Sequence, residues 1–326
     1  MRLGILTFGI LLALSGVTNA SDDILRWKTK AALPTPVDSG AIESIDGIIY
    51  VVGGFNTHLP NGTNALSSVY AYDPTTNSWT TIASLPRPRY DGNGAAVINS
   101  QLYVAGGWTQ VNPPLPHNDL FVYDPPTNTW TSKASIPHLS GCGASGAIRG
   151  MLYLYTPCAG VSAFTNLFDV YDPANDSWTS LPAPNVAHSQ PAFGVINDKF
   201  YIAGGQDENG SEVTNVLEVY DPLTNAWTEL APMPTAVYLP ASAALNGELY
   251  VIGGAGSGQS FERITQAYNP HTNTWRVLSP ELPSPLALAA ATVTYGIIFL
   301  EGGRSSKSSV GSVATNQDLA LPPSIP

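Results

Sequence analysis

The apolar residues of this chain occur in short runs that end at turn-forming residues. Positions 102–105 form one such run, which a glycine pair ends, and positions 121–123 form the next, which Asp124 and Pro125 end. Short apolar runs bounded by glycine, proline and aspartate predict β-strands rather than helices. The chain is therefore predicted to consist mainly of short strands joined by tight turns.

This pattern repeats with a period near fifty residues. Glycine pairs stand at 53–54, 106–107, 204–205, 253–254 and 302–303, while Thr156 and Pro157 replace the pair in the third repeat. One tryptophan per repeat follows at intervals of 48 to 52 residues: Trp27, Trp79, Trp130, Trp178, Trp227 and Trp275. Self-similarity of this length is typical of propeller blades, four-stranded units that cannot bury their own faces alone.

A turn signal precedes each of the last five tryptophans. The turn begins with Asp-Pro or Asn-Pro, and proline presets φ for its first position. Asparagine or aspartate, which tolerate the left-handed conformation, follow at Asn77, Asn128, Asp176, Asn225 and Asn273. We expect a hairpin between the third and fourth strands of each blade.

The composition agrees with an all-β chain and excludes one class of partner. Charged residues make up only 11%, while the chain has 30 glycines and 28 prolines, as expected for many short strands and turns. The formal net charge of −11 argues against DNA or RNA, because nucleic-acid binders concentrate Lys and Arg in a basic patch. We therefore expect no nucleic-acid partner.

The first twenty residues differ from the rest. Arg2 is followed by an apolar run over 3–14 and then by small or polar residues up to Ala20. This pattern predicts a secretory signal peptide at residues 1–20, cleaved before Ser21. A retained anchor is the alternative, but the run is short and no charged stop follows it. We expect the mature chain, residues 21–326, to be secreted or periplasmic, to lack a membrane span and to be a monomer.

The order Gly-Gly, Tyr-Asp-Pro and Trp at this spacing resembles the Kelch repeat over nearly all of the mature chain. The resemblance implies an all-β, six-bladed Kelch-type β-propeller, because there are six glycine-pair positions. Only five Tyr-Asp-Pro segments follow them, and residues 25–34 match 130–137. The strand around Trp27 is therefore expected to be the outer strand of the last blade, with residues 313–321 as its third strand. Such closure leaves no open sheet edge.

The resemblance also implies a ligand face, made by the loops after the glycine pairs and the loops that lead into each first strand. The candidate ligand-binding residues there are Arg87, Arg89, Tyr90, Trp108, His138, His188, Gln206, Glu208, Tyr238 and Arg304. The same loops contain Asp38, Phe55, His58, Asp91 and Asp207. Arginines beside aromatic rings suit carboxylates or sugar rings. For Arg89 a structural hydrogen bond to a neighbouring loop is an equal alternative.

Two carboxylates stand where the other repeats have apolar or small residues. Glu301 occupies the position of Val52, and Glu43 that of Ala96. A carboxylate in such surroundings can have a raised pKa and act as an acid or base, but neutralisation by a backbone donor or a nearby arginine is the favoured alternative. The five histidines show no metal-ligand spacing, so we expect no metal site and no cofactor.

Cys142 and Cys158 lie in the same blade on opposite sides of a predicted hairpin turn. Their positions are one residue out of register for an ideal two-residue hairpin, but a bulge at Thr156 and Pro157 would correct this. Because disulfides persist in exported proteins, we expect a disulfide here rather than two buried thiols.

Two classes of function fit these observations. The first is a secreted binding module that recognises a protein segment or a glycan through its loop face, which rests on fold-level analogy. The second is an enzyme of the sialic-acid mutarotase type, an exported Kelch-like propeller, with Glu43 or Glu208 as acid or base and Arg89 or Arg304 for the sugar carboxylate. A glutamate beside an arginine in a closed cleft would favour the enzyme, whereas an open surface would favour binding.

Overall fold

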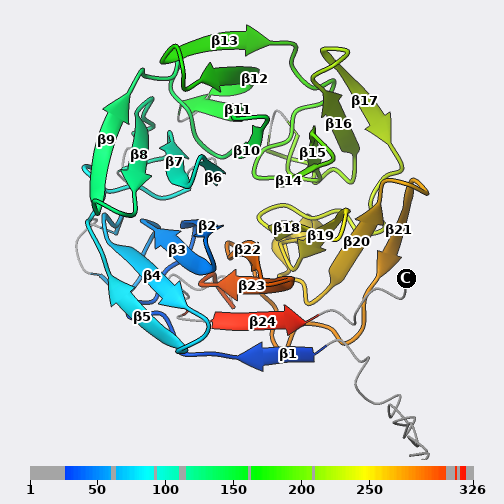
Figure 1. Ribbon diagram of the computed structural model, residues 1–326. Helices are drawn as coiled ribbons and strands as arrows, with labels where there is room; N and C mark the ends of the chain where they lie inside the picture. The colour runs from blue at the N-terminus through cyan, green and yellow to red at the C-terminus, as the bar shows by residue number, and fades with distance from the viewer. Residues whose placement is uncertain are drawn as a thin grey trace, which may run out of the picture.

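The computed structural model describes residues 26–59, 64–91, 94–109, 115–160, 163–207, 210–305, 313 and 316–320. In them the chain forms six four-stranded antiparallel sheets arranged as blades around a central axis (Figure 1). One short 3₁₀ helix, η1 (Ser257–Gln259), lies in a loop. The all-β, six-bladed propeller expected from the repeats is confirmed. The expected signal peptide and Glu208 lie outside the described residues.

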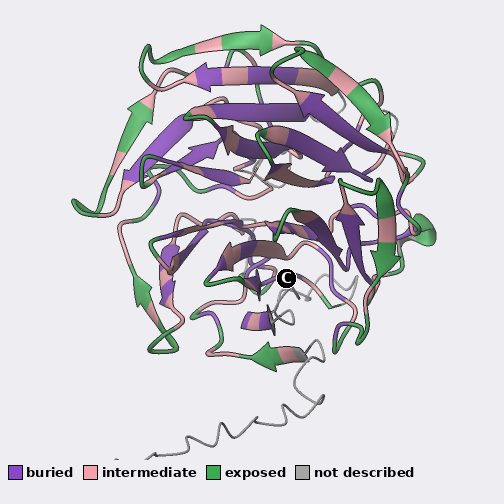
Figure 2. Ribbon diagram, turned by 45° about the vertical axis from the view of Figure 1, so that its right-hand side comes forward, coloured by how far each residue is buried: buried purple, intermediate pink, exposed green. Residues whose placement is uncertain are grey.

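The blades follow one another in chain order, and each runs from the axis outward. Blades 1 to 3 are β2 (Ala41–Ile45), β3 (Ile48–Val52), β4 (Val69–Asp73), β5 (Ser78–Thr81); β6 (Ala95–Ile98), β7 (Gln101–Ala105), β8 (Leu120–Asp124), β9 (Thr129–Lys133); and β10 (Ala144–Ile148), β11 (Met151–Gly160), β12 (Ala163–Asp172), β13 (Ser177–Leu181). Blades 4 and 5 are β14 (Ala192–Ile196), β15 (Lys199–Ala203), β16 (Leu217–Asp221), β17 (Ala226–Leu230); and β18 (Ala241–Leu245), β19 (Glu248–Ile252), β20 (Thr265–Asn269), β21 (Thr274–Val277). Figure 2 shows that the middle strands are buried and the outermost strands exposed.

Both ends of the described chain share the sixth blade. It contains β22 (Ala290–Thr294), β23 (Ile297–Glu301), β24 (Asn316–Ala320) and β1 (Arg26–Thr29), and β24 lies between β23 and β1. Trp27 pairs with Leu319, and Leu319 pairs with Ile298 on the other side. The expected closure by an N-terminal outer strand is confirmed, and Figure 1 shows β1 and β24 side by side at the rim of the ring.

The repeated tryptophan and asparagine join neighbouring blades. Trp79 donates its indole N–H to the carbonyl of Ala31 (2.8 Å), and the Asn77 side-chain oxygen accepts the N–H of the same residue (2.9 Å). The tryptophans of blades 2 to 5 make the same 2.8 Å bond to the preceding blade. Asn77 has φ of 52°, the left-handed conformation that its turn predicts. In blades 1, 2, 3 and 5 the Asn or Asp side chain also accepts the N–H of that residue, so both of its polar groups are fixed; in blade 4 the residue is Pro182, which has no N–H.

The glycine pairs allow the close approach of two loops. In blade 1 the pair has φ of 63° and 100°, and a Cβ on Gly54 would lie 2.2 Å from Val37 and 2.8 Å from the carbonyl of Asp38. Only glycine fits both the conformation and the space. Blade 3 lacks the pair, and its β11 and β12 continue for ten residues each with a register shift between Thr156 and Cys158.

Glu301 is a buried carboxyl group in the closing blade. It is 2% exposed, neither oxygen has a hydrogen-bond partner, and burial raises its pKa well above the usual 4.5. It lies opposite Asn316 of β24, in the place that Val52 and Val69 occupy in blade 1. Burial therefore favours the protonated, uncharged form of this carboxyl group.

The raised pKa of Glu301 predicts how stability changes with pH. Because the folded state holds the proton more tightly, the stabilisation is complete below the unfolded pKa and is lost as pH rises above about 4.5, at up to about 1.4 kcal/mol per pH unit. Glu301→Gln keeps the shape and removes this titration. Urea unfolding across pH 4 to 8 should show that the free energy of unfolding of the variant increases relative to that of the parent as pH rises. If the two free energies change with pH in parallel, the prediction is wrong.

Candidate functional site

A ring of backbone hydrogen bonds surrounds one mouth of the propeller axis. Each blade contributes one residue with a left-handed backbone (φ 47° to 61°) just before its first strand: Ser39, Asp91, Cys142, Gln190, Leu239 and Leu288. Each N–H donates to the carbonyl of the preceding member, and Ser39 donates to Leu288 to close the ring, with distances of 2.8 to 3.2 Å. The ring fixes six loops at equal depth around the axis.

Inside the ring lies a cavity of about 360 Å³. Its wall is formed by the ring residues and by the six innermost strands, β2, β6, β10, β14, β18 and β22. Most wall residues are alanine, glycine or valine, because each innermost strand packs close to its neighbours. The small side chains leave room along the axis for a ligand group.

The two acidic groups of the cavity wall, Glu43 and Asp91, come from blades 1 and 2. Asp91 accepts hydrogen bonds from Gln190 Nε2 (3.0 Å) and Cys142 Sγ (3.6 Å), and burial raises its pKa. Glu43 lies deeper, where its carboxylate accepts from Thr292 Oγ1 (3.4 Å) and the Ser44 N–H (3.3 Å). Burial, opposed by these two bonds, raises the pKa of Glu43 to about 7. Glu43 therefore changes charge near neutral pH.

One group of predicted site residues does come together beside the ring. Arg304 contacts Asp38 (2.8 Å) and lies over the ring of Phe55 at 5.6 Å, and Phe55 meets Tyr90 edge-on at 5.0 Å. Burial and the neighbouring Asp91 raise the pKa of Tyr90 to about 12. These residues join blades 6, 1 and 2, and the guanidinium of Arg304 is already engaged by a carboxylate.

Arg87 and Arg89 share one carboxylate, Asp119. Arg89 is 2% exposed, donates to the carbonyl of Gly106 and lies over Phe121 at 4.7 Å. The geometry therefore supports a structural hydrogen bond to a neighbouring loop, rather than ligand binding, for Arg89. Arg87 is half exposed and lies 2.9 Å from Asp119. Of this pair, only Arg87 is accessible to a ligand.

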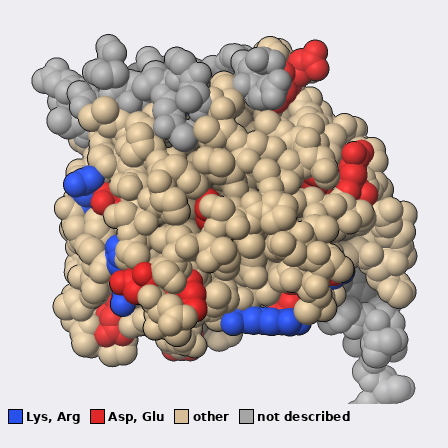
Figure 3. Space-filling view, turned by 90° about the horizontal axis from the view of Figure 1, so that it is seen from above, with Lys and Arg blue, Asp and Glu red and all other residues tan. Residues whose placement is uncertain are grey.

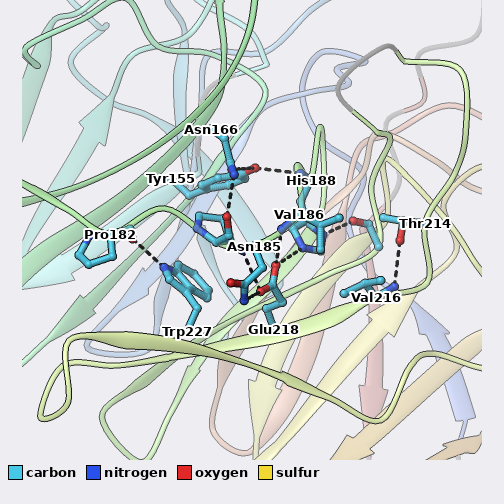
Figure 4. Close-up of polar contacts among 12 residues, drawn as sticks. Tyr155, Asn166, Pro182, Asn185, Val186, His188, Thr214, Val216, Glu218 and Trp227 are labelled. Carbon is cyan, nitrogen blue, oxygen red and sulfur yellow. Dashed lines mark hydrogen bonds and ion pairs between the residues drawn. The ribbon is translucent and has the colours of Figure 1, made fainter.

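His188 is fully buried and holds a loop in place (Figure 4). Its Nδ1 lies 2.7 Å from the carbonyl of Gly204 and its Nε2 lies 3.2 Å from Glu218. Glu218 also accepts the N–H groups of Asn185 and Val186 at 3.0 Å. Burial alone would raise the pKa of Glu218, but the bonds from His188 and these amides hold it below its usual value. His188, predicted as a ligand residue, is a structural one.

The remaining candidates lie in several surroundings. Trp108 and Tyr238 are 6% and 8% exposed, and the Trp108 indole packs against Gly141. His138 lies 3.2 Å from the buried Asp169. Gln206 donates to the carbonyl of Gly210 within its own loop at 3.2 Å. These side chains mainly shape the loops.

The expected disulfide is not formed, because Cys142 and Cys158 are both free thiols. Gly141 lies opposite Cys158 and donates its N–H to the Cys158 carbonyl (2.9 Å), so the offset of one residue persists despite the bulge. Cys142 belongs instead to the ring around the axis. Its hydrogen bond with Cys158, together with burial, raises the pKa of the Cys142 thiol well above its usual range.

Sequence reasoning missed four exposed apolar residues on the loop face. Leu59, Leu115, Leu139 and Phe164 are 38% to 47% exposed; the three leucines lie in loops of blades 1 to 3, and Phe164 lies at the start of β12. A run of β-bridges links these loops, including Tyr90 to Trp108, Trp108 to Pro116 and His117 to Ser140. The sequence did contain a signal for these residues, because they are large and apolar and stand at positions that differ between the repeats. We call these four residues the apolar loop patch.

Two further observations bear on ligands. Among the residues with described positions, no group of three or more His, Cys, Asp or Glu side chains is placed to hold a metal ion. No helix in the same part of the chain is long and apolar enough to cross a membrane. Figure 3, a view onto the edge of the propeller, shows Lys and Arg only in small separate groups on that face.

Six repeated blades, one shared between both chain ends, define a closed β-propeller with its variable loops on one face. Two family models match this chain: the KLHDC2/KLHL20/DRC7 Kelch-repeats domain over residues 19–194 and the Kelch motif over 187–234 and 236–280. The chain belongs to the Kelch-repeat family.

Individual proteins show the same likeness over part of their length. Kelch-like protein 35 of Mus musculus is 30% identical over 172 residues, which are 51% of this chain and 27% of that protein. F-box/kelch-repeat protein At1g67480 of Arabidopsis thaliana is 37% identical over 153 residues, 45% of this chain and 38% of that protein. The solved structure of YjhT has a TM-score of 0.76 at 19% identity and covers 91% of this chain and 98% of its own, which is a likeness of fold.

Proposed function

We propose that this chain is a secreted Kelch-repeat binding module that binds a protein segment across its loop face. The observation that carries the proposal is the apolar loop patch, four large exposed apolar side chains, of which Leu115 and Leu139 lie next to the bridged pairs Trp108–Pro116 and His117–Ser140. Contiguous exposed apolar surface supports protein interaction, whereas single exposed residues are ordinary. Leu223 and Tyr295, on the opposite face, are single exposed apolar residues and not part of a patch.

The arginines support binding rather than sugar chemistry. The mutarotase alternative needs an acid close to an arginine that is free to hold a sugar carboxylate. Arg89 and Arg304 are engaged by Asp119 and Asp38, and the residues that line the cavity around Glu43 include no arginine. Neither Arg89 nor Arg304 is therefore free to hold a sugar carboxylate beside Glu43.

Loss of the patch should weaken binding without unfolding the protein. The probe is a peptide selected from a random display library on the parent protein. Leu115→Ser with Leu139→Ser should weaken its affinity by about tenfold or more, because each removes apolar contact area from the interface. Leu223→Ser with Tyr295→Ser, the matched control on the opposite face, should leave the affinity unchanged.

Two results of these assays would overturn the proposal. One is equal weakening by both pairs of substitutions. The other is a screen in which no peptide is enriched while a glycan array shows retention. Export is a separate part of the proposal, which rests on residues 1–20. N-terminal sequencing of protein recovered from outside the cytoplasm should begin at Ser21.

A further inference from the structure

Among the described residues, the lining of the central cavity includes acidic groups and no basic ones. Asp91 lies in the ring at the mouth, and Glu43 lies four positions further along its blade than the ring residue Ser39. No Lys, Arg or His is among the residues that line the cavity. Arg304 acts on Asp91 from outside the cavity and is paired with Asp38. The two carboxyl groups thus lack a cationic partner within the cavity wall.

A third group on the wall indicates a ligand independently of the acids. Ser145 of β10 is 3% exposed, lines the cavity, and its hydroxyl has no hydrogen-bond partner. In the aligned repeats Ser145 takes the place of Ile42, so it stands at nearly the depth of Glu43. Buried hydroxyl groups are normally satisfied, and an orphaned one on a cavity wall points to a group that binds there.

The rest of the wall suits an aliphatic stem. Leu239 and Leu288 complete the ring opposite the acids, and alanine, glycine and valine side chains line the deeper part. Separate single acceptors match an ammonium group, which has three independent donors, better than they match the planar fork of a guanidinium. An alkylammonium group is the chemistry that fits both the charge and the shape.

We propose that the cavity binds an alkylammonium group, supplied by a lysine side chain of the segment that occupies the loop face. The inference rests on the proposed function, because the ring opens onto the same face as the apolar loop patch. Asp91 attracts the ammonium group at the mouth, and Glu43 and Ser145 accept its hydrogen bonds once it lies further in. The Leu, Ala and Val side chains pack along the methylene groups.

The affinity should rise with pH. Glu43 must be ionised to pair with the ammonium group, and its pKa in the free protein is about 7. The other titratable groups around it are Asp91 and Cys142 on the cavity wall and Tyr50, which is paired with Glu43 on β3. Burial raises the pKa of each, with the Cys158 hydrogen bond the larger cause for Cys142. Binding is expected to strengthen as pH rises through 7.

The test titrates the full protein with n-pentylamine, a truncated lysine side chain, by calorimetry at pH 8. We expect binding, about tenfold weaker binding to Glu43→Gln, and none of 1-pentanol, since a charge-assisted hydrogen bond is lost in each case. Ser145→Ala should weaken binding several-fold. Asp46→Asn, which removes an exposed carboxylate of the same blade, is the matched control and should bind as the parent does. Equal binding of 1-pentanol, or an unaffected Glu43→Gln, overturns the inference.

A second arm separates this inference from the proposed function. Each selected peptide is compared with a copy in which norleucine replaces its lysines. Weaker binding of that copy to the parent, but not to Glu43→Gln, supports the lysine source. If the copy binds the parent equally well and the Leu115 and Leu139 substitutions still weaken it, the loop face binds segments and the cavity inference is wrong. If n-pentylamine binds through Glu43 while no peptide is selected, the cavity holds a free alkylamine and the proposed function fails.

Discussion

A chain that ends before residue 313 should lose its cooperative unfolding transition. β24 lies between β23 and β1, so its removal opens two sheet edges and detaches β1 as well. It also removes Leu319, which is 2% exposed and packs in a core cluster with Ile298 and Trp27. The closing blade would then keep only its two inner strands, β22 and β23.

Urea unfolding followed by tryptophan fluorescence measures this effect. A chain that ends after Ala320 keeps β24 and should unfold as the parent does. A milder variant, Leu319→Ala, should fold and lose about 2 to 5 kcal/mol, the range for a buried leucine. A sharp, parent-like transition in the chain without β24 would show that closure contributes little.

Glu218→Ala should destabilise the protein by about 3 to 5 kcal/mol. The substitution removes the acceptor for the amides of Asn185 and Val186 and the partner of the fully buried His188. Breaking a buried pair leaves the other member without compensation, which is a large penalty. Denaturant unfolding at pH 7 measures the loss, and a loss below about 1 kcal/mol would refute the structural role.

Blade 5 supplies the control for this prediction. There Gln266 takes the place of Glu218 and accepts the Thr235 N–H at 2.8 Å, and Val237 takes the place of His188. The double variant His188→Val with Glu218→Gln copies that arrangement. It should recover most of the stability that Glu218→Ala loses, because no buried charge remains. If the double variant is no more stable than Glu218→Ala, blades 4 and 5 do not use equivalent contacts.

The fold was predictable because one type of contact recurs from blade to blade. Trp79 and Asn77 fix the polar groups of Ala31, and Trp with Asn or Asp stands at the same places in blades 2 to 5, so the sequence shows the contact as a period. The match between residues 25–34 and 130–137 predicted the shared blade for the same reason. A contact that recurs once per blade therefore appears in the sequence as a residue that recurs once per repeat.

The site was less predictable because its residues are those that depart from the repeat. Arg89 and His188 were candidates by loop position, yet both turn inward to a carbonyl of the next glycine pair, Gly106 or Gly204. Spacing gives the loop but not the direction of the side chain. Conversely, the place of Glu43 in the repeat marked it as unusual, and the structure puts it on the cavity wall.

Hydrogen–deuterium exchange with and without the selected peptide tests the central claim, that the loop face binds the segment, most directly. The account predicts slower exchange at residues 54–59, 106–109 and 138–142, which lie in the loops around the ring. Exchange at the hairpin turns 46–47 and 295–296, at the other ends of the innermost strands, should stay unchanged. Protection of those turns with no change in the loops would contradict the account.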